Sequence, residues 1–221
     1  MTPVSFRRAR RLQRLVAALA LLPLAAPLAL TACGDGGDAA RDPVSDAAAD
    51  PITDGVPVLV IGDSLTNGAR LSGELGPALA GAGWAPEIVA EDGRTVEWGL
   101  DQVARRATVP AVVVVGLGTN PGTEPEAFPE RAAELVAQLE TKGASTVVWW
   151  PPGNALDTGR ARRAEALRSL ARGSLVVPDW PAELAAHPEW LDPDSVHYTA
   201  DGYAGLTDFL VAQLAALRPT G

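Results

Sequence analysis

The sequence predicts an α/β protein in which helices cover both faces of a parallel sheet, as a three-layer α/β/α sandwich. Short runs of β-branched and other apolar residues alternate with longer helical segments along the chain. The strand-like runs are apolar throughout rather than at every second residue, which is typical of strands covered on both faces. With right-handed crossovers, this alternation gives one doubly wound domain.

The segments that we expect to form strands are rich in valine and isoleucine and are bounded by glycine or proline. They are residues 58–61, 86–90, 111–116, 146–150 and 174–177. The segments that we expect to form helices have apolar residues at helical spacing or are rich in alanine and leucine. They are residues 67–83, with a break at Pro77, and residues 95–107, 125–142, 160–172, 181–186 and 201–217.

The charge balance excludes some partners. The formal net charge of the 221 residues is −9, and the first 32 residues contain five arginines and no acids. The rest therefore has 18 − 5 = 13 basic against 27 acidic side chains, a net charge of −14. A nucleic-acid partner is not expected, because such proteins present a basic surface. With one cysteine and two histidines, neither an internal disulfide nor a metal site is predicted, and no cofactor motif is present.

Residues 1–32 have the layout of an export signal. Five arginines between residues 7 and 14 precede an apolar run over residues 15–30, which contains two prolines. The run ends in Leu30-Thr-Ala-Cys33, which resembles the lipobox of bacterial lipoproteins. We therefore expect lipidation of Cys33 and anchoring at the outer face of the bacterial cell membrane. The alternative is an ordinary signal peptide with an incidental cysteine.

The chain then divides into a tether and a folded domain. Residues 33–55 are rich in glycine, alanine and aspartate and contain almost no bulky apolar residue, which predicts a flexible acidic linker. We expect the folded domain over residues 56–221. The linker would hold this domain close to the membrane surface.

A serine follows the first predicted strand, where parallel sheets bind their ligands. Ser64 is a candidate nucleophile, although a helix N-cap would explain a serine here as well. A histidine base for it is either His187 or His197. Asp194 stands three residues before His197, where its carboxylate can accept a hydrogen bond from the imidazole. His187 is followed by Pro188 and has no acid at that offset, which favours a structural role.

Four short motifs together resemble the SGNH, or GDSL-type, hydrolases. In chain order they are Gly62-Asp-Ser-Leu-Thr66, Gly93, Gly118-Thr-Asn120 and Asp194-Ser-Val-His197. Each motif is weak alone, but their order and spacing across residues 58–200 are those of the four sequence blocks of the family. The resemblance implies a flavodoxin-like, five-stranded parallel sheet in the order 2-1-3-4-5, with the site beside the first strand.

The resemblance also assigns roles to the matching residues. Ser64 would be the nucleophile, His197 the general base and Asp194 the residue that orients the base. The backbone N–H groups of Ser64 and Gly93 and the side-chain amide of Asn120 would form the oxyanion hole. Asp192 is an alternative to Asp194 as the residue that orients His197. Asp92 and Arg94, which flank Gly93, are alternatives to it as donors or in other roles.

One departure indicates a branch of the family. Many lipolytic members have an aspartate after the asparagine of the third block, whereas Pro121 follows Asn120 here. The pattern over residues 118–122 and 190–202 looks more like the extracellular SGNH domains of bacterial cell-wall O-acetyltransferases. Those domains usually follow a membrane module that supplies the acyl group. No such module stands in this sequence, so a membrane protein is a candidate acyl donor.

The sequence thus predicts a serine esterase or O-acyltransferase that acts on O-acyl, chiefly acetyl, esters of a cell-envelope glycan. Four tryptophans near strand ends or in the last loop could form a sugar platform or pack in the core. They are Trp149, Trp150, Trp180 and Trp190. Two alternatives remain: a lipid-tethered glycan-binding or scaffold protein without turnover, and a lipid hydrolase of the lysophospholipase or thioesterase type.

Overall fold

A computed structural model of the protein describes residues 55–122, 124–153 and 157–217. The predicted export signal, Cys33 and nearly all of the predicted linker lie outside these residues. The described part contains a five-stranded sheet in the order β2-β1-β3-β4-β5, in which all neighbouring strands are parallel. This confirms the predicted fold class and strand order.

The strands lie close to their predicted positions. They are β1 (Val56–Gly62), β2 (Trp84–Ala90), β3 (Val112–Gly116), β4 (Thr146–Trp149) and β5 (Leu175–Val176). Gly62, the last residue of β1, pairs with Ala90 of β2 and with Gly116 of β3. The carboxyl ends of these three strands are therefore level, and the loops that follow them emerge at one edge of the sheet.

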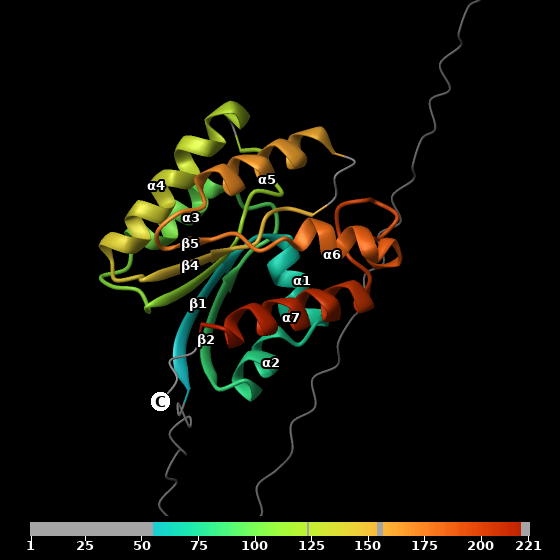
Figure 1. Cartoon of the computed structure of the whole chain (residues 1–221), viewed down its shortest axis with the longest axis horizontal. Coiled ribbons are helices and arrows are strands. Elements are labelled where there is room, and N and C mark those ends of the chain that lie inside the picture. The colour runs from blue at the N-terminus through green and yellow to red at the C-terminus, as the bar shows by residue number, and fades with distance from the viewer. Residues whose placement is uncertain (1–54, 123, 154–156, 218–221) are drawn as a thin grey trace, which may run out of the picture. The chain divides into compact units, whose positions relative to one another are not determined.

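Helices cover both faces of the sheet (Figure 1). In one layer lie α1 (Ser64–Ser72), α2 (Leu75–Gly81), α6 (Trp180–Ala186) and α7 (Ala200–Ala215). In the other lie α3 (Val96–Ala104), α4 (Phe128–Thr141) and α5 (Thr158–Leu170). Two short 3₁₀ helices, η1 (Pro125–Ala127) and η2 (Pro188–Trp190), precede α4 and follow α6.

The central strand β1 explains why its sequence is apolar throughout. Val58 and Val60 pack in the core beneath α1, α2 and α7, whereas Leu59 and Ile61 pack in the core beneath α3, α4 and α5. All four side chains are at most 1% exposed. Burying a side chain of this size stabilises the fold by about 1.5–3 kcal/mol. The end of β1 is therefore held firmly from both sides.

The predicted helix over residues 67–83 is two helices, but the prediction placed the break at the wrong residue. The chain turns at Gly73 and Glu74, and Glu74 adopts a left-handed backbone conformation with φ of 54°. Pro77 lies in the first turn of α2, where a backbone N–H has no partner within the helix. Proline is tolerated there, so it does not end the helix.

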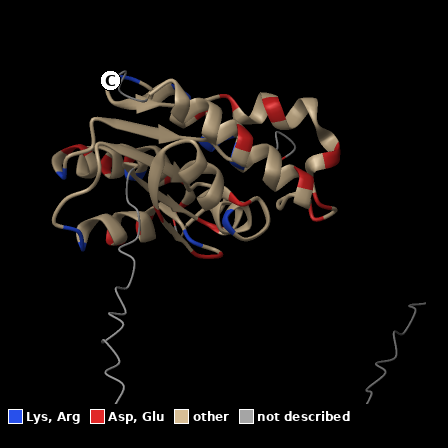
Figure 2. Ribbon diagram, turned by 90° about the horizontal axis from the view of Figure 1, so that it is seen from below, with Lys and Arg blue, Asp and Glu red and all other residues tan. Residues whose placement is uncertain are grey.

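Charged side chains lie on the helices and loops, while the strands carry almost none (Figure 2). This distribution agrees with a sheet that is buried on both faces. Among the residues that the structure describes, no helix combines the length and apolar character that crossing a membrane requires.

Candidate active site

Ser64 begins α1 directly beyond the carboxyl end of β1. Asp63 is the N-cap of this helix, and its Oδ1 accepts a hydrogen bond from the backbone N–H of Leu65 at 3.0 Å. The alternative in which Ser64 is the N-cap is therefore wrong. Its backbone N–H lies at the positive end of the helix dipole, where a developing negative charge is stabilised. The hydroxyl of Ser64 is left free for chemistry.

His197 meets Ser64 although 133 residues separate them in the sequence. The Nε2 atom of His197 lies 3.0 Å from Oγ of Ser64. On the other side of the ring, Nδ1 lies 2.7 Å from Oδ2 of Asp194. Both distances are within hydrogen-bond range, and the order serine, imidazole, carboxylate is the one that acyl transfer uses.

The turn before His197 holds the Asp194 carboxylate in place. Oδ1 of Asp194 accepts the backbone N–H groups of Val196 at 2.8 Å and His197 at 2.9 Å. The hydrogen bond from the imidazole, followed by these two backbone bonds, lowers the pKa of Asp194 to about 2. Asp194 is therefore ionised at neutral pH and favours the tautomer with the proton on Nδ1. Asp192 contacts His197 through its backbone N–H, which donates to the His197 carbonyl at 2.9 Å.

The loops after β2 and β3 meet beside Ser64. The side-chain amide of Asn120 donates to the backbone carbonyl of Arg94 at 2.9 Å. Asn67 of α1 donates to Asp92 at 2.8 Å, which ties the same loop to the serine helix. Gly93 lies between these two anchors with φ of +73°, a left-handed conformation that favours glycine. The loop is thus fixed on both sides of Gly93.

A hollow of about 300 Å³ opens next to these loops. It is lined by Gly93, Thr95, Glu97, Asn120, Pro121 and Gly122. Its size is at the lower end of the range for small-molecule sites. Because its wall includes both Gly93 and Asn120, a group bound there would lie beside the predicted oxyanion donors.

Other candidates from the sequence lie elsewhere. His187 binds Glu189 at 3.0 Å and stacks on Trp190 with ring centroids 4.0 Å apart. Trp149, Trp150 and Trp180 are at most 1% exposed and pack in the core. A sugar platform built from these three tryptophans is therefore wrong. Their indole rings fill the space between the strand ends and the helices instead.

One acidic residue of the site was missed by the sequence analysis. The side chain of Asp63 has no exposed surface, and burial raises its pKa to about 6. Hydrogen bonding with Leu65 and Thr119 acts in the opposite direction and lowers this pKa. The charge of His197 also lowers this pKa. The sequence offered one signal: an aspartate between a buried strand and the serine of a helix start is in the N-cap position.

Replacing Asp194 with asparagine should lower turnover of a small ester by at least about 100-fold, because a neutral amide does not stabilise the charged imidazole that forms during catalysis. Steady-state kinetics on the purified chain measure this. Asp192→Asn is the matched control, since its contact with His197 is made by the backbone. An equal loss in both variants would contradict the assignment of Asp194.

Comparisons with known proteins agree with this geometry. The family model described as GDSL-like Lipase/Acylhydrolase matches residues 60–204. The C-terminal catalytic domain of Streptococcus pneumoniae peptidoglycan O-acetyltransferase A, solved with a methylsulfonyl adduct, is 25% identical with a TM-score of 0.57. The match covers 76% of this chain and 98% of that domain. No curated protein of similar sequence was found.

Two further solved structures share the fold. The lipase/acylhydrolase from Enterococcus faecalis is 20% identical with a TM-score of 0.58, and the match covers 75% of this chain and 98% of that one. A Slackia heliotrinireducens protein described as a putative SGNH hydrolase is 22% identical with a TM-score of 0.56, and the match covers 72% of this chain and 99% of that one. The chain belongs to the GDSL-like lipase/acylhydrolase family and is an SGNH ester hydrolase or acyltransferase.

Proposed function

We propose that the protein is a serine esterase or O-acetyltransferase that acts on acetyl esters of a cell-envelope glycan. The observation that carries the proposal is the line of contacts from Ser64 Oγ to His197 Nε2 at 3.0 Å and from His197 Nδ1 to Asp194 at 2.7 Å. A serine is a weak nucleophile until an adjacent base accepts its proton, and this arrangement supplies that base.

In the first step, Oγ of Ser64 attacks the ester carbonyl and its proton passes to Nε2 of His197. The ionised Asp194 stabilises the imidazolium that results. When the tetrahedral intermediate collapses, the bond to the alcohol oxygen breaks and the imidazolium gives its proton to that oxygen. The acyl group is then an ester on Ser64, and the sugar hydroxyl is released.

The oxyanion of this intermediate needs hydrogen-bond donors. The backbone N–H groups of Ser64 and Gly93 and the amide of Asn120 are our candidates. The Asn120 nitrogen carries two hydrogens, of which one is donated to the Arg94 carbonyl, so the second can serve the oxyanion. A donor of this kind is worth about 3–4 kcal/mol of transition-state stabilisation.

In the second step, His197 accepts the proton of an incoming hydroxyl, whose oxygen attacks the acyl carbon. As the bond between the acyl carbon and Oγ of Ser64 breaks, the imidazolium returns the proton to Oγ. Water as acceptor gives a free acid, and a sugar hydroxyl gives a new ester. The hollow beside Gly93 and Asn120 offers space for a small acyl group or part of an acceptor. Which acceptor reacts depends on how well the site positions it and excludes water.

Two observations support a glycan ester as substrate. The Streptococcus pneumoniae neighbour, matched over 98% of its length, is the catalytic domain of a peptidoglycan O-acetyltransferase. In addition, Pro121 follows Asn120 where many lipolytic members have an aspartate. A membrane protein that supplies the acyl group would be the partner for a transferase reaction.

We also propose that the protein acts outside the cytoplasm as a lipoprotein anchored through Cys33. The support is the sequence Leu30-Thr-Ala-Cys33 after an arginine-rich start and an apolar run. Growth of a producing bacterium with a labelled fatty acid should label the wild-type chain and not Cys33→Ala. Equal labelling of both chains would remove this anchor from the proposal.

The substrate proposal is tested by an assay that supplies O-acetylated cell-wall glycan and unacetylated acceptor glycan together. Free acetate measures hydrolysis, and acetate recovered on the acceptor measures transfer. We expect acetate release or transfer in proportion to enzyme, and neither reaction with Ser64→Ala. Hydrolysis of long-chain phospholipid or thioester substrates, without action on the glycan, would favour the lipid-hydrolase alternative instead.

A further inference from the structure

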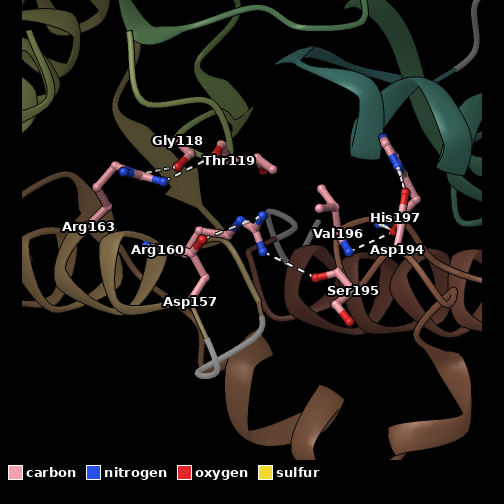
Figure 3. Close-up of polar contacts among 9 residues, drawn as sticks. All are labelled: Gly118, Thr119, Asp157, Arg160, Arg163, Asp194, Ser195, Val196 and His197. Atoms are coloured by element: carbon pink, nitrogen blue, oxygen red, sulfur yellow. Dashed lines mark hydrogen bonds and ion pairs between the residues drawn. The ribbon is translucent and has the colours of Figure 1, made fainter. Parts of the chain in front are cut away.

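Two arginines of α5 reach the two loops that carry the site residues (Figure 3). Arg163 contacts the loop after β3, which carries Asn120, and Arg160 contacts the turn that holds Asp194 and His197. The two arginines are three residues apart, so they project from the same side of the helix. The sequence predicted a helix over residues 160–172 and assigned no role to its arginines.

Arg163 is a buried cation that binds backbone carbonyls. Its residue is 8% exposed, its Nε donates to the carbonyl of Gly118 at 2.6 Å, and its Nη2 donates to that of Thr119 at 3.1 Å. Gly118 has φ of +113°, so this segment needs a specific backbone path. Because Asn120 follows directly, the guanidinium fixes the loop backbone from which the Asn120 side chain projects.

Arg160 holds the other loop. Its Nη1 donates to the carbonyl of Ser195 at 3.2 Å, and its side chain is only 13% exposed. Asp157, the N-cap of α5, accepts the backbone N–H of Arg160 at 2.8 Å and lies 3.8 Å from its Nη2. Asp157, at the start of the same helix, therefore holds both the backbone and the guanidinium group of Arg160.

The turn that Arg160 contacts has an unusual backbone. Ser195 has φ of 58°, in the left-handed region, which costs a non-glycine residue about 1–2 kcal/mol. This conformation places the N–H groups of Val196 and His197 toward the carboxylate of Asp194. A charged donor on the Ser195 carbonyl, together with the bond from Ser195 N–H to the Asp192 carbonyl at 2.8 Å, stabilises the turn.

We propose that Arg160 and Arg163 are positioning residues for the reaction. Arg160 fixes the turn that presents Asp194 and His197 to Ser64, and Arg163 fixes the loop that presents Asn120 to the oxyanion. The inference rests on the proposed acyl transfer at Ser64. One rigid helix thus sets the distance between the base and the oxyanion donor, which lie on separate loops.

Both residues should affect turnover more than substrate binding. A displacement of about 1 Å in a reacting group can cost about 100-fold in rate, whereas the substrate still binds the same surfaces. We expect Arg160→Met and Arg163→Lys each to lower kcat by 10- to 100-fold, with KM changed by less than about threefold. Arg162→Met, an exposed residue between them, is the matched control and should retain full activity.

Crossed double-mutant cycles on the full chain test which loop each arginine acts through. In an Asp194→Asn background the loss from Arg160→Met should shrink to less than about threefold, while in an Asn120→Ala background it should persist in full. The loss from Arg163→Lys should shrink in the Asn120→Ala background and persist in full in the Asp194→Asn background. A loss that is equal in both backgrounds would come from general destabilisation and would overturn the proposal.

A measurement without substrate separates this inference from the proposed function. The chain has two histidines, so the imidazole proton signals are assigned by comparison with His187→Gln. The Nδ1 proton of His197, bound to Asp194, should broaden or shift in the nuclear magnetic resonance spectrum of Arg160→Met and stay unchanged in Arg162→Met. An unchanged signal in Arg160→Met overturns the role of Arg160. Absence of esterase activity in the wild type, with the expected spectral change, would reject the proposed function alone.

Discussion

Ser64→Ala should lower the turnover of a small acetyl ester at least about a thousandfold. The alanine removes the oxygen that forms the acyl-enzyme, while His197 and the oxyanion donors stay in place. Any remaining rate would come from water activated by His197 at the same site. The measurement is steady-state hydrolysis by wild type and variant, after both are shown to unfold at the same temperature.

Ser72→Ala is the control for this variant, because Ser72 is an exposed serine at the other end of α1. A serine-directed organophosphate should add mass to Ser64 in the wild type and in Ser72→Ala, and add none to Ser64→Ala. If the wild type gains no mass and hydrolyses no ester, the protein is a binding or scaffold member of its family. If Ser64→Ala keeps its activity, another nucleophile is at work.

The fold could be predicted because the informative residues act locally. Four consecutive valines in β3 and the apolar run in β1 can only be buried on both faces, which implies two helical layers. The position of the break near Pro77 could not be predicted, since proline is compatible with a first helical turn and the true break depends on how Glu74 turns the chain.

The parts of the site that follow from the strand order could be predicted. The parts that depend on the path of a loop, or on which groups a long side chain contacts, could not. In the order 2-1-3-4-5, the loops after β1 and β3 must be neighbours, so Ser64 and Asn120 belong together. The contact between Ser64 and His197 depends on the path of the last loop, for which only the family resemblance gave a signal. Arg160 and Arg163 gave none, because arginines on a helix are usually solvated.

Asp63→Asn should raise the free energy of unfolding by about 3 kcal/mol at pH 8 and change it little at pH 3.5. Burial raises the pKa of Asp63 from 3.8 to about 6, so the folded protein favours the protonated form. The protonated Asp63 therefore makes its full contribution to the free energy of unfolding of the wild type below pH 3.8. This contribution is lost as the pH rises through 6. A shift of this size corresponds to about 3 kcal/mol. Asparagine does not ionise and caps a helix as well as aspartate.

The matched control is Asp157→Asn, because Asp157 is also a helix N-cap but is half-exposed. The backbone hydrogen bond from Arg160 lowers the pKa of Asp157, so this variant should lose stability at pH 8 and approach the wild type in acid. Urea unfolding of both variants at several pH values measures these changes in the free energy of unfolding. At pH 8 the change should be positive for Asp63→Asn and negative for Asp157→Asn. A parallel pH dependence in the two variants would contradict the burial of an ionised Asp63.

The stabilised Asp63→Asn variant should also be the slower enzyme. The negative charge of Asp63 interacts with His197 and favours the imidazolium that forms when Ser64 gives up its proton. Without this charge we expect turnover to fall on the order of tenfold at pH 8, where the wild-type carboxyl is ionised. At pH 5 the wild-type carboxyl is mostly protonated in the folded state, so the two enzymes should approach each other. The buried aspartate would then be retained for its charge in the reaction, at a cost in stability.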